Sequence, residues 1–555
     1  MLVVFPRRPG PLLARAAGLA WLLYGCAGVG GLEPSAQPSR PLAGNPAPSA
    51  RPETSSAPAA GIASVAARAV AAAPDGGTDA PAGGDPAAPA GPPAAPDGPR
   101  LWSQDYLTWI WPKPEVGGRF LGTIRAGQSV RLRSQQVVAG QRCPRGFFAI
   151  EPRGYVCWDR TVTLEPDSPF LRAVGHTLPR PGPFPYDYAL SNGAPMYTRI
   201  PSAAEQKRNE WRYGPAGEVP PLPKFLRGHE QLAVLDAIRP ADPMPDFLAG
   251  KGSARGPALQ LFRRSIPRGS MMSFTRAFES DGRTFVLSTD LTVVPAERLR
   301  IFRPSSFHGV SLGAGVELPI GWLRGSAKPE YRRNAAGAIE PTGASWPVRT
   351  FVRLDARGSE IEQGGHKYVR VEPPADGTGD RFADLGDLTV VRRETERPFG
   401  VPEGSRWLVV SITGGTLVAY EDLTPVYATL ISPGQGGVPT EGRDHVKYST
   451  TPLGAYRITF KDSAATMSPE MGEDRSFWIA DVPHTQYFNP PFALHAAYWH
   501  ESFGEPMSAG CINASPIDAE WLFGWTLPHV PEGWHGATGA GAPENGGSSF
   551  VVVRR

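Results

Sequence analysis

Two side chains near the C-terminal end of the chain could together perform nucleophilic chemistry. Cys511 lies in the run Ser508-Ala509-Gly510-Cys511-Ile512-Asn513, and His495 lies 16 residues before it, after the apolar run 492–494. A thiol becomes a nucleophile when a neighbouring base favours the thiolate, and a preceding glycine lets the backbone approach a substrate without a Cβ in the way. The spacing suits a histidine on one strand that faces a cysteine on the next turn. Taken alone, however, an inert buried cysteine and a structural histidine would explain these two residues better.

The surrounding sequence resembles the signature of the YkuD-type L,D-transpeptidases, in which a histidine is followed at a distance by Ser/Thr-His-Gly-Cys-hydrophobic-Asn. The run 451–456 (Thr-Pro-Leu-Gly-Ala-Tyr) resembles the TPxG strand entry of that family, and 416–420 resembles its early hairpin. The resemblance covers residues 406–540, about a quarter of the chain. It implies a β-rich catalytic domain that is exported to the cell envelope and acts on peptidoglycan stem peptides.

The resemblance also implies a role for each matching residue. Cys511 is the nucleophile and His495 takes and returns its proton, while Ser508, Gly510 and Asn513 match positions that shape and brace the site. The thiolate attacks the carbonyl of the third stem-peptide residue, and backbone N–H groups near Gly510 and Cys511 hold the tetrahedral intermediate. The resulting thioester is resolved by the amine of a second stem peptide, by a wall-attached protein or by water.

One position departs from the family pattern. The family has a histidine before the glycine, and this chain has Ala509. The change removes a polar group beside the nucleophile, which affects the rate, the recognition of the acceptor, or both. His500 would restore some of this polarity if its side chain turned inward, although a histidine in such a place is more often solvated at the end of a strand.

Other functions explain parts of the same pattern. His495, His500 and Cys511 would be three ligands of a zinc hydrolase, but their spacing matches no standard zinc motif, so we expect no metal and no cofactor. A non-catalytic peptidoglycan-binding lipoprotein would keep the fold with a decayed site, and an L,D-carboxypeptidase would release the acyl group to water. Acylation of Cys511 by a carbapenem separates the decayed site from an enzyme, since such β-lactams acylate the family.

The N-terminus has the features of an export signal. Arg7, Arg8 and Arg15 precede a ten-residue apolar core at 16–25, which is too short to span a membrane. The run Leu23-Tyr24-Gly25-Cys26 resembles a bacterial lipobox, which implies lipidation of Cys26 and a periplasm-facing lipoprotein that touches the membrane only through its lipid. An ordinary signal peptide and secretion to the periplasm remain the alternative.

Composition defines the next segment. Between Tyr24 and Trp102 there is no Phe, Trp or Tyr, and Ala, Pro and Gly dominate, so we expect a disordered linker over 27–100. The whole chain has a net charge of only +3, which gives no reason to expect nucleic acid as a partner.

The remaining cysteines are interpreted as one pair and one single thiol. Cys143 and Cys157 lie 14 residues apart and flank a predicted hairpin, 147–150 and 155–158. In an exported protein this spacing predicts a disulfide, and two reduced core cysteines are the alternative. Cys511 is then expected to be unpaired.

The rest of the chain is predicted to be mainly β. Residues 101–165, with short strand-like runs at 122–130 and 130–138, resemble a bacterial SH3-like small β-barrel module. Residues 166–400 are expected to form a β-rich middle region, because Asp-Leu-Thr-Val-Val at 290–294 recurs at 387–391 and each copy follows a Gly-led aromatic strand. Spacer domains with no ligand of their own would explain this region equally well.

Residues 401–555 are expected to form the catalytic domain, a β-sandwich-like fold with one short helix. Strands are predicted at 407–412, 416–420, 425–431, 477–480 and 492–495. The helix is predicted to begin after Ser515, because Pro516 suits its first position and Asp518 lies three residues after the cap.

Overall fold

The computed structural model describes a mainly β protein over residues 98–213, 222, 226–249, 265–313, 315–355, 360–372, 380–467 and 478–555. The predicted signal peptide 1–26, with its candidate lipidation residue Cys26, lies outside the described residues, as does nearly all of the linker 27–100. Within the described ranges, no helix is both long enough and apolar enough to cross a membrane.

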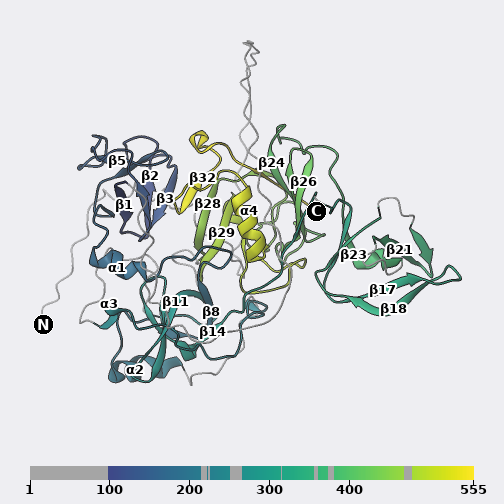
Figure 1. The fold of residues 1–555 in the computed structure, drawn as a ribbon, viewed down its shortest axis with the longest axis horizontal. Coiled ribbons are helices and arrows are strands. Elements are labelled where there is room, and N and C mark those ends of the chain that lie inside the picture. Colours follow the sequence, from purple (N-terminus) through teal and green to yellow (C-terminus); the bar gives the residue numbers. More distant parts are fainter. Residues whose placement is uncertain are drawn as a thin grey trace, which may run out of the picture. The chain divides into compact units, whose positions relative to one another are not determined.

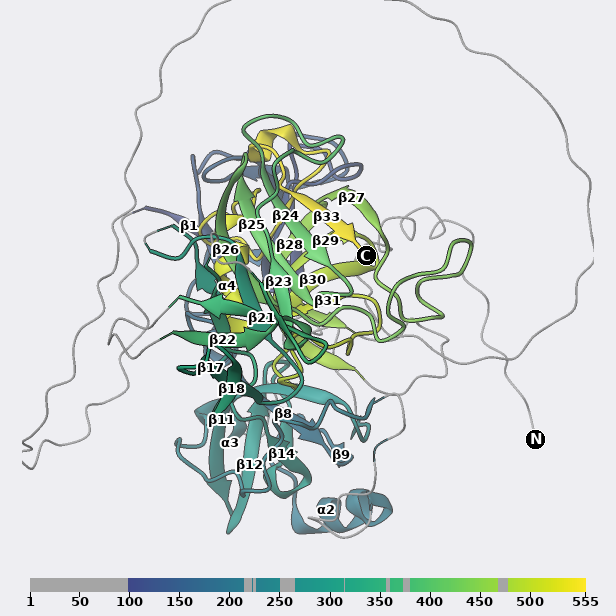
Figure 2. The same ribbon diagram turned by 90° about the vertical axis from the view of Figure 1, so that its right-hand side faces the viewer.

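The C-terminal region contains a six-stranded sheet whose middle strands are those expected from sequence (Figure 2). Its order is β15 (Val310–Ser311), β26 (Thr424–Leu430), β25 (Thr416–Glu421), β24 (Arg406–Ser411), β33 (Phe550–Arg554) and β27 (Gly454–Arg457). Leu408 and Val410 of β24 pack into one core, and Trp407 packs into another on the opposite face. Burial of both faces explains why these strands are almost continuously apolar instead of alternating.

A helix, α4 (Pro516–Trp525), packs near this sheet against β29 (Ile479–Asn489) and β30 (Phe492–Ala496) (Figure 1). It begins as the sequence predicts, because Ser515 Oγ accepts a hydrogen bond from Asp518 N at 3.0 Å. At its other end the buried Lys461 donates to the carbonyl oxygens of Phe523 and Thr526. Burial lowers the pKa of Lys461 to about 7. The ammonium faces the partial negative charge of the helix C-terminus, which offsets part of this burial cost.

A 12-stranded sheet joins parts of the chain that are far apart in sequence. Its main path is β13 (Val293–Pro295), β12 (Arg283–Ser288), β11 (Met271–Ser280), β29, β28 (Phe460–Met467), β32 (Gly536–Thr538), β3 (Gly122–Arg125) and β2 (Leu107–Ile110). Four strands branch from this path: β8 (Asp187–Ser191), β14 (Leu299–Ile301), β30 and β31 (Ile512–Ala514). The sheet therefore combines strands of the predicted N-terminal module, the middle region and the catalytic region.

The remaining strands form small sheets. A five-stranded sheet contains β18 (Ile339–Trp346), β17 (Lys328–Arg333), β22 (Arg381–Asp384), β21 (His366–Val371) and β20 (Ile361–Gln363). A three-stranded sheet contains β19 (Phe351–Arg353), β16 (Ile320–Leu323) and β23 (Leu388–Val391), and a two-stranded one contains β9 (Ala194–Pro195) and β10 (Ser265–Ile266). The other α-helices are short: α1 (Pro169–Gly175), α2 (Ala203–Glu210) and α3 (Asp246–Ala249).

The segment expected to be an SH3-like module divides its strands among three sheets. One contains β4 (Ser129–Arg131), β1 (Arg100–Ser103) and β7 (Val162–Thr163), and another contains β5 (Phe147–Ala149) and β6 (Tyr155–Cys157). The β2–β3 hairpin instead extends the large sheet through β32, and its core includes Trp534. The SH3-like barrel stays a prediction. The runs expected at 122–130 and 130–138 are shorter than predicted, because residues 126–128 form a turn at Gly127, which has a φ of +81°.

The cysteine pair predicted in this segment is present. Cys143 and Cys157 form a disulfide with a Cα–Cα distance of 5.8 Å. It links the approach to β5 with the end of β6, so it closes the predicted hairpin at its open end.

The two copies of the repeated pentapeptide do not occupy equivalent positions. Residues 290–294 form a turn and the start of β13, which pairs with β12. Residues 387–391 end a 3₁₀ turn and form β23, which pairs with β16. The Gly-led aromatic strands expected before the two copies are present as β12 and β21. The matching letters nevertheless follow different local paths, because different partner strands pair with them.

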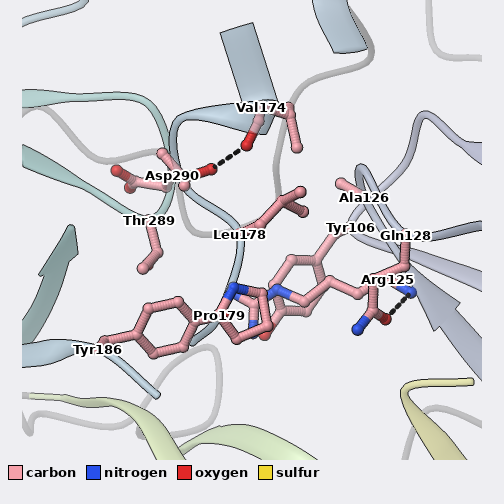
Figure 3. A pocket seen from close by; sticks show the side chains of 11 residues that line it. Tyr106, Arg125, Ala126, Gln128, Val174, Leu178, Pro179, Tyr186, Thr289 and Asp290 are labelled. Atoms are coloured by element: carbon pink, nitrogen blue, oxygen red, sulfur yellow. Dashed lines mark hydrogen bonds between the residues drawn. The ribbon is translucent and has the colours of Figure 1, made fainter. Parts of the chain in front are cut away.

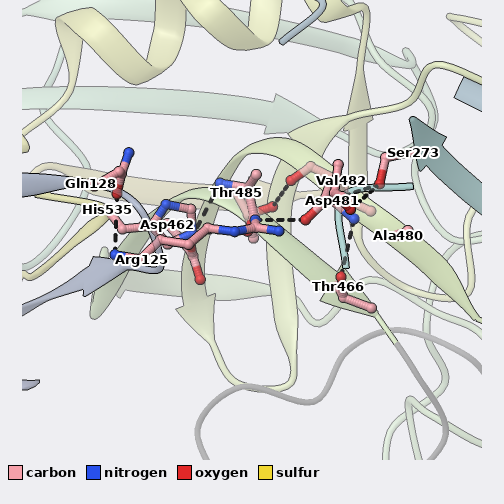
Figure 4. A network of polar contacts seen from close by, with 12 residues as sticks. Arg125, Gln128, Ser273, Asp462, Thr466, Ala480, Asp481, Val482, Thr485 and His535 are labelled. Atoms are coloured by element: carbon pink, nitrogen blue, oxygen red, sulfur yellow. Dashed lines mark hydrogen bonds and ion pairs between the residues drawn. The ribbon is translucent and has the colours of Figure 1, made fainter. Parts of the chain in front are cut away.

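A buried ion pair joins the three regions within the large sheet (Figure 4). Arg125 of β3 donates to Asp481 of β29 at 2.6 Å, and the Asp481 carboxylate also accepts from Thr289 Oγ1 at 2.7 Å and from Ser273 Oγ. Burial by itself would raise the pKa of Asp481, but the Arg125 guanidinium and the hydroxyl donors outweigh it and hold the pKa below its usual range. The carboxylate is therefore ionised and fully satisfied inside the protein.

A small cavity lies beside this ion pair, lined in part by Tyr106, Arg125, Tyr186 and Asp290 (Figure 3). Its volume is about 10 Å³. A single water molecule needs roughly that much space, so the cavity is too small for a substrate.

We predict that Asp481→Asn lowers the free energy of unfolding by about 3–5 kcal/mol, because it leaves the buried Arg125 without its counter-charge. Urea denaturation of the reduced and oxidised protein measures the change. The matched control is Asp187→Asn, which breaks the exposed Arg180 pair and should cost at most about 1 kcal/mol. Equal effects of the two substitutions would contradict the prediction.

Candidate active site

Two short parallel strands place the predicted nucleophile and base beside each other. β30 pairs with β31 in the register Leu494 with Ile512 and His495 with Asn513. Cys511 comes directly before β31 and lies next to Ala493, whose backbone N–H is 3.4 Å from Cys511 Sγ. Because side chains alternate along a strand, His495 and Cys511 project from the same face, with Cα atoms roughly 8 Å apart for this register. The expected strand-and-turn arrangement is therefore present.

The sulfur of Cys511 lies in a buried setting beside one backbone donor. Its side chain is fully buried, and the N–H of Ala493 points toward Sγ. A backbone donor stabilises negative charge on sulfur. The expectation that Cys511 is unpaired is wrong, because Cys511 is disulfide-bonded in this structure, and Cys143–Cys157 is the one pair whose two members both lie among the described residues. Any nucleophilic role belongs to the reduced form.

The tautomer of His495 suits a proton acceptor. His495 Nδ1 is 3.0 Å from the carbonyl oxygen of Ala496, so Nδ1 carries the proton and Nε2 has a lone pair. The ring is almost completely buried, and burial lowers the pKa of His495 to about 4. The imidazole is thus neutral at physiological pH and able to take a proton.

His500 faces inward, contrary to the expectation of a solvated residue. It is fully buried, its Nδ1 accepts a hydrogen bond from Ser502 N at 3.2 Å, and its Nε2 lies 3.1 Å from the side-chain amide of Asn513. The atom of Asn513 at this distance is Nδ2. A neutral ring has one acceptor nitrogen and Nδ1 already accepts from Ser502 N, so a hydrogen bond at Nε2 requires the Asn513 amide to turn its oxygen toward the ring. Burial lowers the pKa of His500 to about 3, which keeps the ring neutral. His500 therefore orients Asn513, the register partner of His495.

Ser508 and Gly510 shape the turn before the nucleophile. Ser508 Oγ donates to the carbonyl oxygen of Cys511 at 2.5 Å and accepts from Gly510 N at 3.0 Å. The N–H of Gly510, one of the groups expected near the oxyanion, is thus bonded to Ser508 Oγ in this structure. Gly510 has a φ of +122°, and a Cβ there would lie 2.5 Å from the ring of Phe492. The position needs glycine for its backbone conformation and for packing.

Sequence reasoning missed the aromatic and histidine side chains around the site. The ring of Trp499 lies 5.9 Å from His495 and 6.1 Å from His500, and the ring of His229 from the middle region lies 5.9 Å from Trp499. An aromatic-rich run at 498–503 is the signal that could have indicated this packing. No signal in the sequence connects His229, 282 residues before Cys511, with this place.

Among the residues that the structure describes, no group of three or more His, Cys, Asp or Glu side chains is arranged to hold a metal ion.

Ala509, the position that departs from the family pattern, is partly exposed next to Ser508 and Gly510. Its methyl group adds no polar side chain to the turn.

We predict that the protein loses stability as the pH falls from about 6.5 to about 4. Burial lowers the pKa of His229, His484 and His495 to about 4 and that of His500 to about 3. In this window the unfolded chain binds more protons than the folded protein, so acid favours unfolding. His495→Gln should reduce the slope of the unfolding free energy by up to about 1.4 kcal/mol per pH unit. Urea denaturation at several pH values checks this, and identical slopes in both proteins would contradict it.

We also predict that Ser508→Ala slows alkylation of reduced Cys511 by iodoacetamide about 10–100-fold, because the turn then loses both of the contacts that fix it. Ser508→Thr keeps the hydroxyl and should react like the wild type. Mass spectrometry of the Cys511 peptide over time gives the rates. The prediction fails if the alanine variant reacts as fast as the threonine variant.

Comparison with known proteins finds similarity over part of the chain. Three solved L,D-transpeptidase structures are similar to part of the chain: one from Xylanimonas cellulosilytica (20% identity, 29% of this chain and 65% of that chain, TM-score 0.19), a mutant from Enterococcus faecium (20%, 27% and 50%, 0.20) and one from Mycobacterium smegmatis (14%, 46% and 89%, 0.20). The chain thus spans less than two thirds of the first two. No curated protein matches it.

The family comparison concerns the C-terminal region. Residues 405–538 match the model of the L,D-transpeptidase catalytic domain, YkuD. The matched range contains His495, Cys511 and the strands that carry them, as expected from the motif. The C-terminal region of this chain is a YkuD L,D-transpeptidase catalytic domain.

Proposed function

We propose that this chain is an L,D-transpeptidase that acts on peptidoglycan stem peptides through a thioester on Cys511. The observation that carries the proposal is the placement, within a YkuD domain, of Cys511 and a neutral His495 on one face of adjacent strands. His495 has the tautomer that accepts a proton, and Ala493 N–H points at the sulfur. These features support the nucleophile and base that the motif predicts.

The reaction proceeds by acyl transfer. His495 Nε2 takes the proton from reduced Cys511, and Sγ attacks the carbonyl carbon of the third stem-peptide residue. The tetrahedral intermediate collapses, its C–N bond breaks, and the terminal D-amino acid leaves with the proton returned by His495. An acceptor amine then attacks the thioester, loses its proton to His495 and releases the thiol.

The acceptor amine determines the product of the reaction. The amine of a second stem peptide gives a 3→3 cross-link, and the amine of a protein side chain gives a wall-attached protein. Because peptidoglycan is the proposed substrate, we expect the enzyme in the bacterial cell envelope. A lipid on Cys26 would anchor the protein to the membrane, and the linker 27–100 would let the catalytic domain reach peptidoglycan away from it. This part of the proposal rests on the sequence alone.

The site differs from the expectation that backbone N–H groups near Gly510 and Cys511 are both available to the oxyanion. Gly510 N–H is used by Ser508 Oγ, so the donor for the oxyanion is a different group unless the turn opens when substrate binds. Ala509 adds no polar side chain. We therefore expect a slow enzyme, with the acceptor step more affected than the attack by Cys511.

The decisive experiment uses the full chain, reduced, with purified disaccharide-tetrapeptide and mass spectrometry of the products. We predict a 3→3 dimer with loss of the terminal D-amino acid in the wild type and none in Cys511→Ala. Ala509→His should raise the yield. The unfolding midpoint of each variant controls for folding.

Other outcomes would replace the proposal. Trimmed monomer without dimer indicates an L,D-carboxypeptidase. No product from the wild type, combined with turnover by Ala509→His, indicates a peptidoglycan-binding lipoprotein with a decayed site. Acylation of Cys511 by a carbapenem, detected as a mass increase on its peptide, tests the first half of the reaction separately from the acceptor.

A further inference from the structure

The chain between His495 and Cys511 is held by residues from outside the YkuD domain. This connecting loop, residues 497–510, leaves β30 just after the base and returns just before the nucleophile. Its most tightly held part is the turn 499–504. Among the side chains of the middle region, which sequence reasoning left as a possible spacer, three donate hydrogen bonds to this turn: Gln231, Arg324 and Arg349.

Gln231 contacts two neighbouring residues of the turn. Its amide nitrogen donates to Ser502 Oγ at 2.8 Å, and its amide oxygen accepts from Glu501 N at 2.9 Å. Next to it, Leu232 N donates to the Trp499 carbonyl at 3.4 Å. The Gln231 amide is therefore hydrogen-bonded to both Glu501 and Ser502.

The two arginines hold carbonyl oxygens on the same turn. Arg324 Nη1 donates to the carbonyl oxygen of Gly504, and Arg349 donates to the carbonyl oxygen of Glu501 and, at 3.2 Å, to its carboxylate. Charged donors to carbonyl groups are among the stronger hydrogen bonds in proteins. The turn is therefore held at Glu501, Ser502 and Gly504 by residues from outside the YkuD domain.

The fixed turn leads to the reacting residues through a short series of contacts. Ser502 N donates to His500 Nδ1, His500 Nε2 lies against the Asn513 amide, and Asn513 pairs in register with His495. Asn513 also lies two residues after Cys511. A displacement of the Glu501–Ser502 backbone would change the tautomer or position of His500 and, through Asn513, the alignment of the two strands.

We propose that Gln231, Arg324 and Arg349 form a loop clamp that positions His495 and Cys511, so the middle region supports catalysis instead of serving only as a spacer. These are positioning residues, since none of them touches the sulfur or the base. The inference rests on the proposed function for its catalytic meaning. Gln231 is exposed, Arg349 is partly buried, and both help to line an open cavity of about 260 Å³, so neither side chain belongs to a buried core.

Clamp variants and matched controls test the inference in the full chain. The clamp variants are Gln231→Ala and Arg349→Ala. Gln363→Ala removes an amide that bridges the backbone N–H and C=O of Ile339, as Gln231 bridges Glu501 N and Ser502 Oγ. Arg332→Ala breaks an arginine–glutamate pair with Glu340, and neither control residue touches the loop. We expect each clamp variant to lower the rate of carbapenem acylation about 10–100-fold, with the concentration for half-maximal rate little changed. The controls should stay within twofold of the wild type.

Two further readouts separate positioning from folding and from the proposed function. Nitrogen-15 NMR of the imidazoles should show His500 leaving its single tautomer in Gln231→Ala, while the unfolding midpoint is unchanged, and Arg349→Lys should recover part of the rate. If the wild type is not acylated at all, the proposed function fails, and the clamp is then judged by iodoacetamide alkylation of Cys511 and by the His500 tautomer. Clamp variants that match the controls in alkylation, acylation and tautomer would overturn the inference.

Discussion

The carboxylate of Asp481 lies inside the large sheet, where an ion without partners would be far too costly to bury. It is stable there because Arg125 comes from the N-terminal segment and the hydroxyls of Ser273 and Thr289 come from the middle region. Each contributor is useful only when the others are in place, so three distant parts of the chain must assemble together. Since β29 continues through a hairpin into the strand of His495, the same requirement extends to the residue proposed as the base.

A second constraint acts on the loop that joins His495 to Cys511. The YkuD domain contains His495 and Cys511, the two residues proposed to react, and the parallel strands that set them side by side. Ser508 and Gly510 then fix the turn before the nucleophile from within, and the clamp fixes the far side of the loop from outside. Acyl transfer depends on distances within fractions of an ångström, and a loop held at both ends can keep them.

Several expectations from sequence are confirmed because they depend on neighbouring residues. The strands β24, β25 and β26, the start of α4 after Ser515 and the Cys143–Cys157 disulfide all follow from local patterns of apolar, capping and turn residues. The errors concern longer-range features. His500 is buried instead of solvated, Cys511 is disulfide-bonded instead of unpaired, and the two copies of the pentapeptide pair with different strands.

The sequence by itself determined that the C-terminal region belongs to the YkuD family, because the motif around Cys511 and His495 needs only residue types and spacing. The tertiary structure decided how that chemistry is supported. Arg125 and Asp481 lie 356 residues apart, and Gln231 lies 271 residues from Ser502, so no local pattern relates them. Whether a polar side chain is exposed or becomes a buried partner depends on strand register and on what covers it, and both are set only when distant segments pack together.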